Sequence, residues 1–243
     1  MRQLLPVPGD VDPYDVYRPD APELVRINMV ASVDGAVVDE HGRSGSLGGA
    51  ADREVFRVLR ALSDVIVVGA GTARREGYGP HRMPARLAQR RAAEGRALPS
   101  PIAVVSASLD LDVDTPLFAE AVVPTIVLTT ATADPSRRTA LARAATVLEV
   151  GEEAIDPARA RRALVERGLP HILVEGGPQP NAALIGAGVV DELCLTLSPA
   201  LVGGDGPRLA GALTDRQTLS LRGALVEGDE LFLRYAVGPK RWG

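Results

Sequence analysis

The chain of 243 residues is 46% hydrophobic but only 3% aromatic, and its formal net charge is −4 at pH 7. Few rings are available to stack on bases, and the charge gives no attraction to nucleic acid or to an acidic membrane surface. No apolar run reaches the length of a bilayer span, and the first residues lack the hydrophobic core of a signal peptide. One cysteine and three scattered histidines exclude an internal disulfide and offer no metal-ligand spacing. We therefore expect a cytoplasmic α/β protein that binds neither nucleic acid, membrane nor metal.

The first hundred residues alternate between apolar runs and glycine-bearing turns. Residues 1–22 are rich in proline and aspartate and are expected to form an irregular arm. The patterns that follow predict a strand over 24–31, an amphipathic helix over 51–62, a buried strand over 65–68 and a helix near 85–94. Residues 73–100 are otherwise expected to lie on the surface. No ordinary helix is expected directly after Gly69-Ala70-Gly71-Thr72.

The second part of the chain continues in strand–helix units and then changes. Strands are predicted over 102–106, 125–129, 146–150 and 172–174, and helices over 136–145 and 157–167. Near the C-terminus, strands are predicted over 192–198, 219–225 and 230–236, the last two joined by a hairpin turn at 226–229. This order predicts an α/β fold with a mostly parallel central sheet, flanking helices and a C-terminal antiparallel hairpin, in one domain over 23–238.

The stretch from His171 to Leu184, HILVEGGPQPNAAL, is the most informative in the chain. A buried strand ends at Glu175, and a helix is expected to open at Asn181 as its N-cap. The turn between them, Gly176-Gly177-Pro178, is typical of a site where backbone N–H groups meet a phosphate. A tight turn with a solvated glutamate is the plainer interpretation.

Three such turns follow apolar strands, at 32–35, 69–72 and 175–178. If the strands are parallel neighbours, all three turns lie at one sheet edge, where open α/β sheets bind ligands. Asp34 in the first turn is either a turn-forming residue or a functional carboxylate. Arg60 lies off the apolar stripe of its helix, so it is either a solvated cation or a phosphate ligand.

Four motifs in order resemble the RibD C-terminal domain family, the pyrimidine reductases of riboflavin biosynthesis, whose fold is that of dihydrofolate reductase. The motifs are NMVASVDG from Asn28 to Gly35, Leu59-Arg60-Ala61, DVIVVGAGT from Asp64 to Thr72, and LVEGGP from Leu173 to Pro178 with Asn181. The resemblance runs from about residue 24 to residue 235. It implies NADPH as the hydride donor and a ribosylaminopyrimidine 5′-phosphate as the acceptor, whose ribosyl group becomes ribityl.

The resemblance also implies roles for individual residues. The cofactor is expected to contact Ala31, Gly71, Thr72, Glu76, Ser106 and the turn Gly176, Gly177 and Pro178. The substrate is expected to contact Asn28, Ser44, Ser46, Arg60 and Glu175. Asp34 and Glu175 are the expected catalytic carboxylates: Asp34 stabilises the charged imine, and Glu175 anchors substrate donors.

Some positions depart from the family pattern. Ser46 replaces a tryptophan that many members have, Glu76 replaces an aspartate, and the loop 73–96 does not match closely. A reductase of another heterocycle, such as a pterin or folate, and a nucleotide-binding protein without turnover therefore remain as alternatives. Family members usually form homodimers, and the apolar late strands predict one here.

Overall fold

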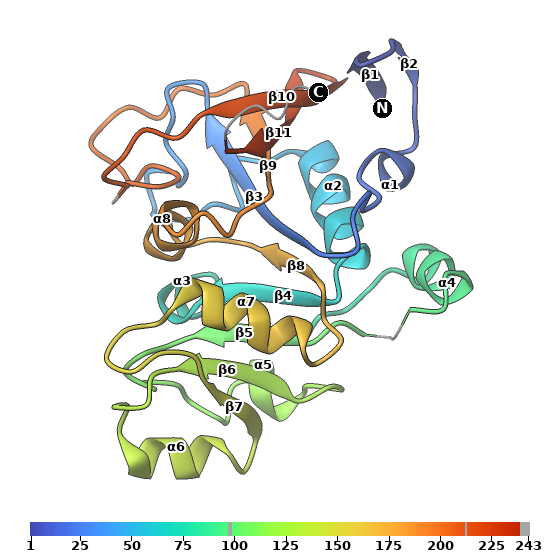
Figure 1. The fold of residues 1–243 in the computed structure, drawn as a ribbon. Helices are drawn as coiled ribbons and strands as arrows, with labels where there is room; N and C mark the ends of the chain where they lie inside the picture. The colour runs from blue at the N-terminus through green and yellow to red at the C-terminus, as the bar shows by residue number, and fades with distance from the viewer. Residues whose placement is uncertain (97–98, 212, 239–243) are drawn as a thin grey trace.

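The computed structural model describes residues 1–96, 99–211 and 213–238, and these form one mixed sheet with helices on both faces (Figure 1). The strands are β1 (Arg2–Leu5), β2 (Gly9–Asp10), β3 (Leu24–Ser32), β4 (Val65–Gly69), β5 (Ile102–Val105), β6 (Thr125–Thr129), β7 (Ala145–Glu149), β8 (His171–Val174), β9 (Glu192–Ser198), β10 (Leu219–Glu227) and β11 (Glu230–Val237). The helices are α1 (Pro13–Val16), α2 (Ala50–Ala61), α3 (Ala70–Arg75), α4 (Ala85–Ala93), α5 (Pro116–Ala119), α6 (Pro135–Leu141), α7 (Pro157–Val165) and α8 (Pro178–Gly186).

The strand order is β2-β1-β10-β11-β9-β3-β8-β4-β5-β6-β7. From β9 to β7 all neighbours are parallel, whereas β11, β10, β1 and β2 pair antiparallel. The predicted α/β class, with a mostly parallel sheet and a C-terminal antiparallel hairpin, is confirmed. Among the helices of these described segments, none is long and apolar enough to cross a membrane.

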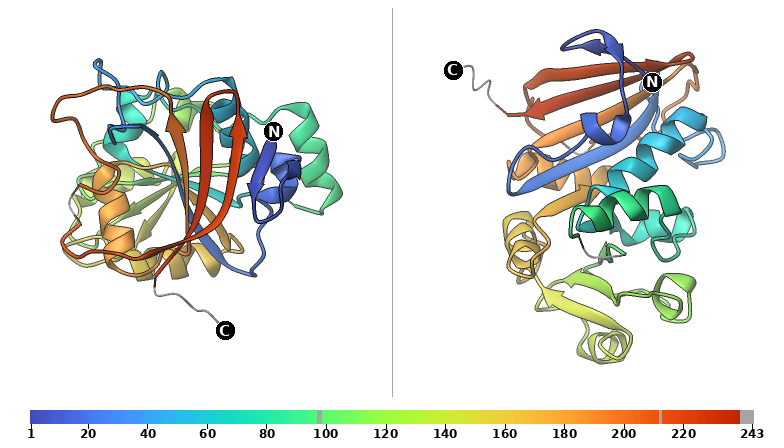
Figure 2. Two further views of the ribbon diagram at one scale, coloured as in Figure 1. Left: turned by 90° about the horizontal axis from the view of Figure 1, so that it is seen from above. Right: turned by 90° about the vertical axis from the view of Figure 1, so that its right-hand side faces the viewer.

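Successive side chains along each strand point to opposite faces of the sheet, so the core consists of two layers, one on each face. In β4, Ile66 and Val68 pack with α2 and α4, while Val65 and Val67 pack with α7 and α8. Figure 2 shows these two helix pairs on opposite sides of the sheet. Because the strands in the middle are covered on both faces, their sequences are continuous apolar runs rather than alternating ones.

The N-terminal arm is not irregular, as the sequence led us to expect. Strand β1 pairs with β10, with Arg2 opposite Val226, and so extends the sheet. Helix α1 buries Tyr14, and the Arg90 guanidinium of α4 lies 3.9 Å from the centre of that ring. The density of proline predicted irregularity, but pairing with a distant strand orders the segment. The division into an arm and a domain over 23–238 stays a prediction.

Two further expectations about helices near the glycine turns are wrong. Helix α3 begins at Ala70, directly after β4, although no ordinary helix was expected there. Helix α8 begins at Pro178, with Gly177 as its N-cap, rather than at Asn181. Proline suits the first helical position because it lacks the N–H that would be unpaired there. Asn181 is instead a fully buried helix residue whose amide donates to the Leu209 carbonyl at 3.0 Å.

Candidate active site

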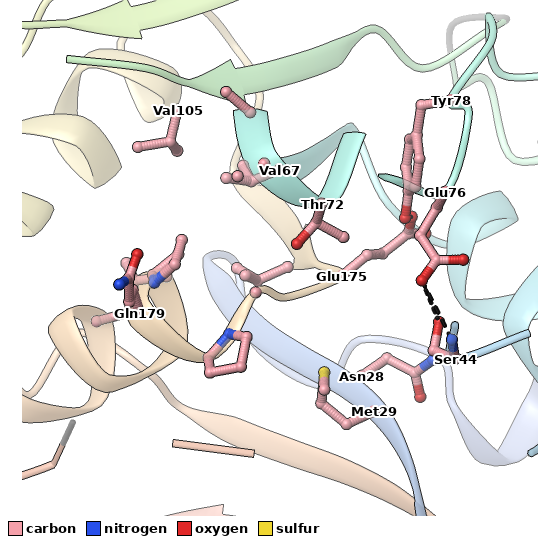
Figure 3. A pocket seen from close by; sticks show the side chains of 18 of the residues that line it. Asn28, Met29, Ser44, Val67, Thr72, Glu76, Tyr78, Val105, Glu175 and Gln179 are labelled. Atoms are coloured by element: carbon pink, nitrogen blue, oxygen red, sulfur yellow. Dashed lines mark hydrogen bonds between the residues drawn. The ribbon is translucent and has the colours of Figure 1, made fainter. Parts of the chain in front are cut away.

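Three strand ends meet at one edge of the sheet, as the sequence predicted. Strand β8 lies between β3 and β4 and is parallel to both. The turn after β8 is tied to β4, because Glu175 N donates to Val67 O at 2.9 Å and Gly69 N donates to Gly176 O at 3.1 Å. This edge opens into a cavity of about 1190 Å³ that extends from α2 and α3 to α7 and α8. The edge is therefore the candidate active site (Figure 3).

A buried cluster of Arg60, Glu175 and Tyr78 forms one wall of this cavity. Arg60 donates from Nε and Nη2 to the two oxygens of Glu175, both at 2.6 Å, and the Tyr78 hydroxyl donates to Oε2 at 2.8 Å. The Glu175 side chain is only 2% exposed, against 18% for Arg60. The Phe56 ring lies 4.2 Å from the Arg60 guanidinium carbon and covers it. The two-pronged contact fixes the carboxylate plane rigidly.

The electrostatics of the cluster define its protonation state. Burial raises the pKa of Tyr78 well above its ordinary value, and the negative charge of Glu175 raises it further. Burial alone lowers the pKa of Arg60, but the charge of Glu175 and the hydrogen bonds to it more than reverse this, so the net shift is upward. Tyr78 is consequently a protonated donor, and Arg60 and Glu175 form an ion pair. The cluster therefore offers a ligand both an acceptor, the Glu175 carboxylate, and donors, the Arg60 guanidinium and the Tyr78 hydroxyl.

A second hydrogen-bonded pair, Ser44 and Glu76, lines the cavity beside this cluster. Glu76, at the end of α3, accepts hydrogen bonds from Ser44 N at 3.1 Å and from Ser44 Oγ at 3.2 Å. Both residues line the cavity together with Asn28. This pair ties the loop after β3 to α3, and Figure 3 shows it beside the Glu175–Tyr78 contact.

The opposite wall is formed by Thr72 and the start of α8. Gly71, Thr72, Gly177 and Pro178 all line the cavity. Gly177 has a φ of +54°, and a Cβ built there lies 2.9 Å from Thr72 Oγ1. A side chain at this position therefore meets both backbone strain and a close neighbour. Figure 3 shows Thr72 pointing into the cavity between Gln179 on one side and the Glu175–Tyr78 pair on the other.

This wall offers fewer backbone donors than the sequence motif suggested. The first helical position of α8 is Pro178 and the third is Pro180, and neither has an N–H group. The N–H of Asn181 already donates to Gly177 O at 3.0 Å. Within the first turn, the N–H groups left to face an anion are those of Gly177 and Gln179. Ser106, at the end of β5, also lines the cavity, and its hydroxyl accepts a hydrogen bond from Leu109 N at 3.1 Å.

Four residues expected at the site lie outside the cavity lining. Ala31 is a buried residue of β3, and Gly176 contributes its carbonyl to β4 rather than a surface to the cavity. Ser46 is exposed, and its hydroxyl donates to Asp39 Oδ2 at 2.5 Å. Asp34, which was expected to be catalytic, is the fourth, and its catalytic role stays a prediction.

Asp34 is exposed and holds a distant loop instead of facing the cavity. Its carboxylate accepts hydrogen bonds from Gly203 N at 2.7 Å, Val202 N at 3.2 Å and Ser32 Oγ at 2.5 Å. The neighbouring Val33 N donates to Ala200 O at 2.9 Å. The carboxylate thus uses its acceptor sites to fasten the segment 200–203 onto the turn after β3. These contacts lead us to propose that Asp34 positions this loop, in place of the catalytic role predicted from the sequence.

The Asp34→Asn variant is therefore expected to keep a kcat close to that of the unaltered protein. The donors from Ser32, Gly203 and Val202 lower the pKa of Asp34 to about 2. Its contribution to loop docking is thus complete above the ordinary aspartate pKa and is lost only as the pH falls through about 2. Steady-state kinetics of the folded variant checks this expectation. A fall in kcat of about 100-fold, the scale of one lost acid–base group, would return Asp34 to a catalytic role.

Residues that line the cavity were also missed in the sequence. Tyr78 lies in the loop 73–100, which was expected to be mostly surface, yet its hydroxyl contacts Glu175. In a chain with only 3% aromatic residues, a tyrosine between two glycines was the available signal. Phe56 and Asp52 lie four and eight residues before Arg60 on α2, so helical periodicity places them on the same face.

Comparisons with known proteins agree with this geometry. The model of the RibD C-terminal domain family matches residues 23–232. The 2,5-diamino-6-ribosylamino-4(3H)-pyrimidinone 5′-phosphate reductase of Aquifex aeolicus is 31% identical, over 91% of this chain and 99% of that protein. A reductase of the same name from Archaeoglobus fulgidus is 29% identical, over 74% of this chain and 82% of that protein.

The fold agrees with a solved structure as well. A pyrimidine reductase-like protein from Corynebacterium diphtheriae superimposes with a TM-score of 0.84 at 27% identity, over 95% of this chain and 100% of that one. This agreement confirms the reductase fold that the four motifs implied. The family match covers most of the chain and includes the strand ends, Arg60, Glu175 and the glycine turn. The chain therefore belongs to the RibD C-terminal domain family.

Proposed function

We propose that this protein is an NADPH-dependent reductase that converts the ribosyl group of a ribosylaminopyrimidine 5′-phosphate into a ribityl chain. The observation that carries the proposal is one cavity that combines the Arg60–Glu175–Tyr78 cluster with the Thr72–Gly177 wall. The cluster supplies both acceptors and donors for a polyhydroxylated chain. The names of the reductases from Aquifex aeolicus and Archaeoglobus fulgidus support the choice of substrate.

The residues present fit a dinucleotide cofactor along the wall formed by α3 and α8. Gly177 leaves open the space that a side chain would fill, and Thr72 presents its hydroxyl beside it. The N–H groups of Gly177 and Gln179 face the same side as the positive end of the α8 dipole, which favours a pyrophosphate. Ser106 lies farther along the sheet edge, where the adenosine portion is proposed to bind.

The substrate chain is proposed to lie against the cluster. Glu175 accepts hydrogen bonds from hydroxyl groups of the opened ribosyl chain, and the Tyr78 hydroxyl and Ser44 are further polar contacts. Arg60 uses Nε and Nη2 for Glu175, and its Nη1 is proposed to face the 5′-phosphate. NADPH, when bound, supplies the hydride that reduces C1′ of the imine. The imine nitrogen keeps its proton and becomes an amine.

A spectrophotometric assay tests this function. The protein is mixed with NADPH and, in turn, with the diaminopyrimidinone phosphate, the corresponding aminouracil phosphate and dihydrofolate. We expect the absorbance of NADPH to fall with a ribosylaminopyrimidine phosphate and not with the protein alone. Consumption only with dihydrofolate would indicate a pterin or folate reductase, and tight NADPH binding without consumption would indicate a binding protein.

The protein is also proposed to be a homodimer that uses the sheet face formed by β9, β10 and β11. On this face Leu231 lies opposite Leu197 and Leu233 opposite Leu195, and all four are only partly buried. Leu221 on β10, in the next row, is 44% exposed. A patch of partly exposed leucines on one sheet face is typical of a surface covered by another subunit. A two-fold axis, the commonest closed symmetry, lets the same face serve both copies.

Sedimentation at micromolar concentration is expected to give a mass near twice 25.5 kDa. The Leu221→Glu variant is expected to shift the equilibrium to the monomer, because it places a charge within the contact. Val122→Glu is the matched control, since Val122 is 79% exposed and lies beside β6 at the other end of the sheet. A monomeric unaltered protein, or equal behaviour of both variants, would contradict the proposed interface.

A further inference from the structure

Asp52 is a third carboxylate of the cavity, besides Glu175 and Glu76, and neither the family motifs nor the comparisons assign it a role. It occupies the third position of α2, and its side chain lines the cavity on the same helix face as Phe56 and Arg60. Eight residues of helix separate Asp52 from Arg60, which corresponds to about 12 Å along the helix axis. The two residues therefore lie at opposite ends of one wall.

Asp52 is not needed to cap its own helix. An acidic residue at the third helical position often reaches back to the N-cap N–H. Here Glu230 of β11 takes that position instead, because its Oε1 accepts from Gly49 N at 2.6 Å and its Oε2 from Asp52 N at 3.4 Å. A carboxylate from a distant strand thus satisfies the helix N-terminus. The side chain of Asp52 therefore does no capping; it lies against Gly48, accepts a hydrogen bond from Thr196 and borders the cavity.

The loop before α2 leaves room for this carboxylate. A Cβ built on Gly48 would lie 2.0 Å from Asp52 Oδ2 and 2.8 Å from Asp52 Cβ. Such contacts are too short for any side chain, so the observed position of Asp52 requires a glycine at position 48. A side chain at position 48 would consequently displace the Asp52 carboxylate.

The surroundings of Asp52 favour a ligand that donates hydrogen bonds. Burial raises the pKa of Asp52, and the nearby charge of Glu230 raises it too, while a hydrogen bond from Thr196 and the charge of Arg53 lower it. The net direction is upward, so the ionised form is under-stabilised in the protein. Burial removes water from the Asp52 carboxylate, and hydrogen-bond donors on a bound molecule would replace that water.

We propose that Asp52 accepts two hydrogen bonds from the 2-amino group and the adjacent ring N–H of the pyrimidinone, and thereby selects the diaminopyrimidinone over the aminouracil substrate. The inference rests on the proposed function. With the phosphorylated chain at Arg60, a ring about 12 Å away along α2 lies beside Asp52. In the aminouracil, a carbonyl oxygen replaces the 2-amino group. That oxygen places an acceptor against the carboxylate, so one hydrogen bond is lost and a repulsion is added.

The ratio of kcat/KM for the two substrates tests the inference, because the ratio does not depend on the fraction of folded enzyme. We expect the unaltered protein to prefer the diaminopyrimidinone by about 100-fold or more. Asp52→Asn is expected to reduce this ratio by at least about tenfold, since the amide can donate to the uracil carbonyl. Gly48→Ala keeps the charge but displaces the carboxylate, and it is expected to reduce the ratio as well.

Glu54→Gln is the matched control on the same helix. Glu54 pairs with Arg86 at the surface and is expected to leave the ratio unchanged. An unaltered protein that reduces both pyrimidines without preference, or an Asp52→Asn variant with an unchanged ratio, would overturn the role of Asp52 alone. A protein that reduces neither pyrimidine would contradict the proposed function and this inference together.

Discussion

The Glu175→Gln variant is expected to lose about 100-fold in kcat/KM for the pyrimidine, mainly through a higher KM. The carboxylate receives two hydrogen bonds from Arg60 and one from Tyr78, and its side chain is 2% exposed. An amide of the same shape keeps one acceptor, removes the charge and turns a donor toward Arg60 or Tyr78. Losing one hydrogen bond to a charged group costs about 1.5–3 kcal/mol, which is the scale of the expected change. Steady-state kinetics at saturating NADPH measures it.

Two controls separate substrate binding from damage to the site. Tyr78→Phe removes one donor to the same carboxylate but leaves the Arg60 pair intact, so a smaller loss is expected. The NADPH dissociation constant of Glu175→Gln is expected to stay near that of the unaltered protein, because Glu175 is not proposed to contact the cofactor. A normal KM in a folded Glu175→Gln protein would show that the substrate is anchored elsewhere in the cavity.

Gly177→Val is expected to weaken NADPH binding by about 1–3 kcal/mol, the usual cost of overfilling a close-packed site. The new Cβ would lie 2.9 Å from Thr72 Oγ1, and the branched side chain would extend into the space proposed for the pyrophosphate. The backbone there has a φ of +54°, which adds strain for any residue except glycine. Titration of NADPH by calorimetry measures the change in affinity.

Gly168→Val is the matched control for that backbone strain. Gly168 has a φ of +74°, but a Cβ built there has nothing within 4 Å. Both variants are expected to lower the thermal unfolding temperature, whereas only Gly177→Val is expected to weaken NADPH binding. Equal NADPH affinity in the two variants would mean that the turn at 176–178 is structural only.

The pattern of the sequence predicted the parallel strands and the edge at which they end. Continuous apolar runs such as Val65–Val68 are typical of strands covered on both faces, and the runs that end at residues 68 and 174 are followed by glycine turns. Glu175, Arg60 and Thr72, whose roles the family resemblance implied, do line the cavity, and each is held there by its own strand end or helix. For these residues, local position along the chain already determined the place in the fold.

Where the structure differs from the sequence-based expectations, contacts between segments that are distant in the chain determine the positions of the residues. Asp34 follows β3 as expected, but the backbone of Val202 and Gly203 determines where its carboxylate points. Tyr78 lies in a loop without periodicity, and only its contact with Glu175 brings it into the cavity. The arm was expected to be irregular because it is rich in proline and aspartate, and its pairing with β10 spans nearly the whole chain. Such pairings leave no signal in a local window of the sequence.

The transfer of deuterium from the nicotinamide of NADPH to the substrate tests the central claim, namely that this cavity reduces C1′ of a ribosylaminopyrimidine phosphate. The protein is incubated with NADPH deuterated at C4 and the diaminopyrimidinone phosphate, and the product is analysed by mass spectrometry with fragmentation. The account predicts one deuterium in the ribityl chain, at C1′, and much less product with Glu175→Gln. NADPH that is bound but not consumed, or a product that carries deuterium elsewhere, would contradict it.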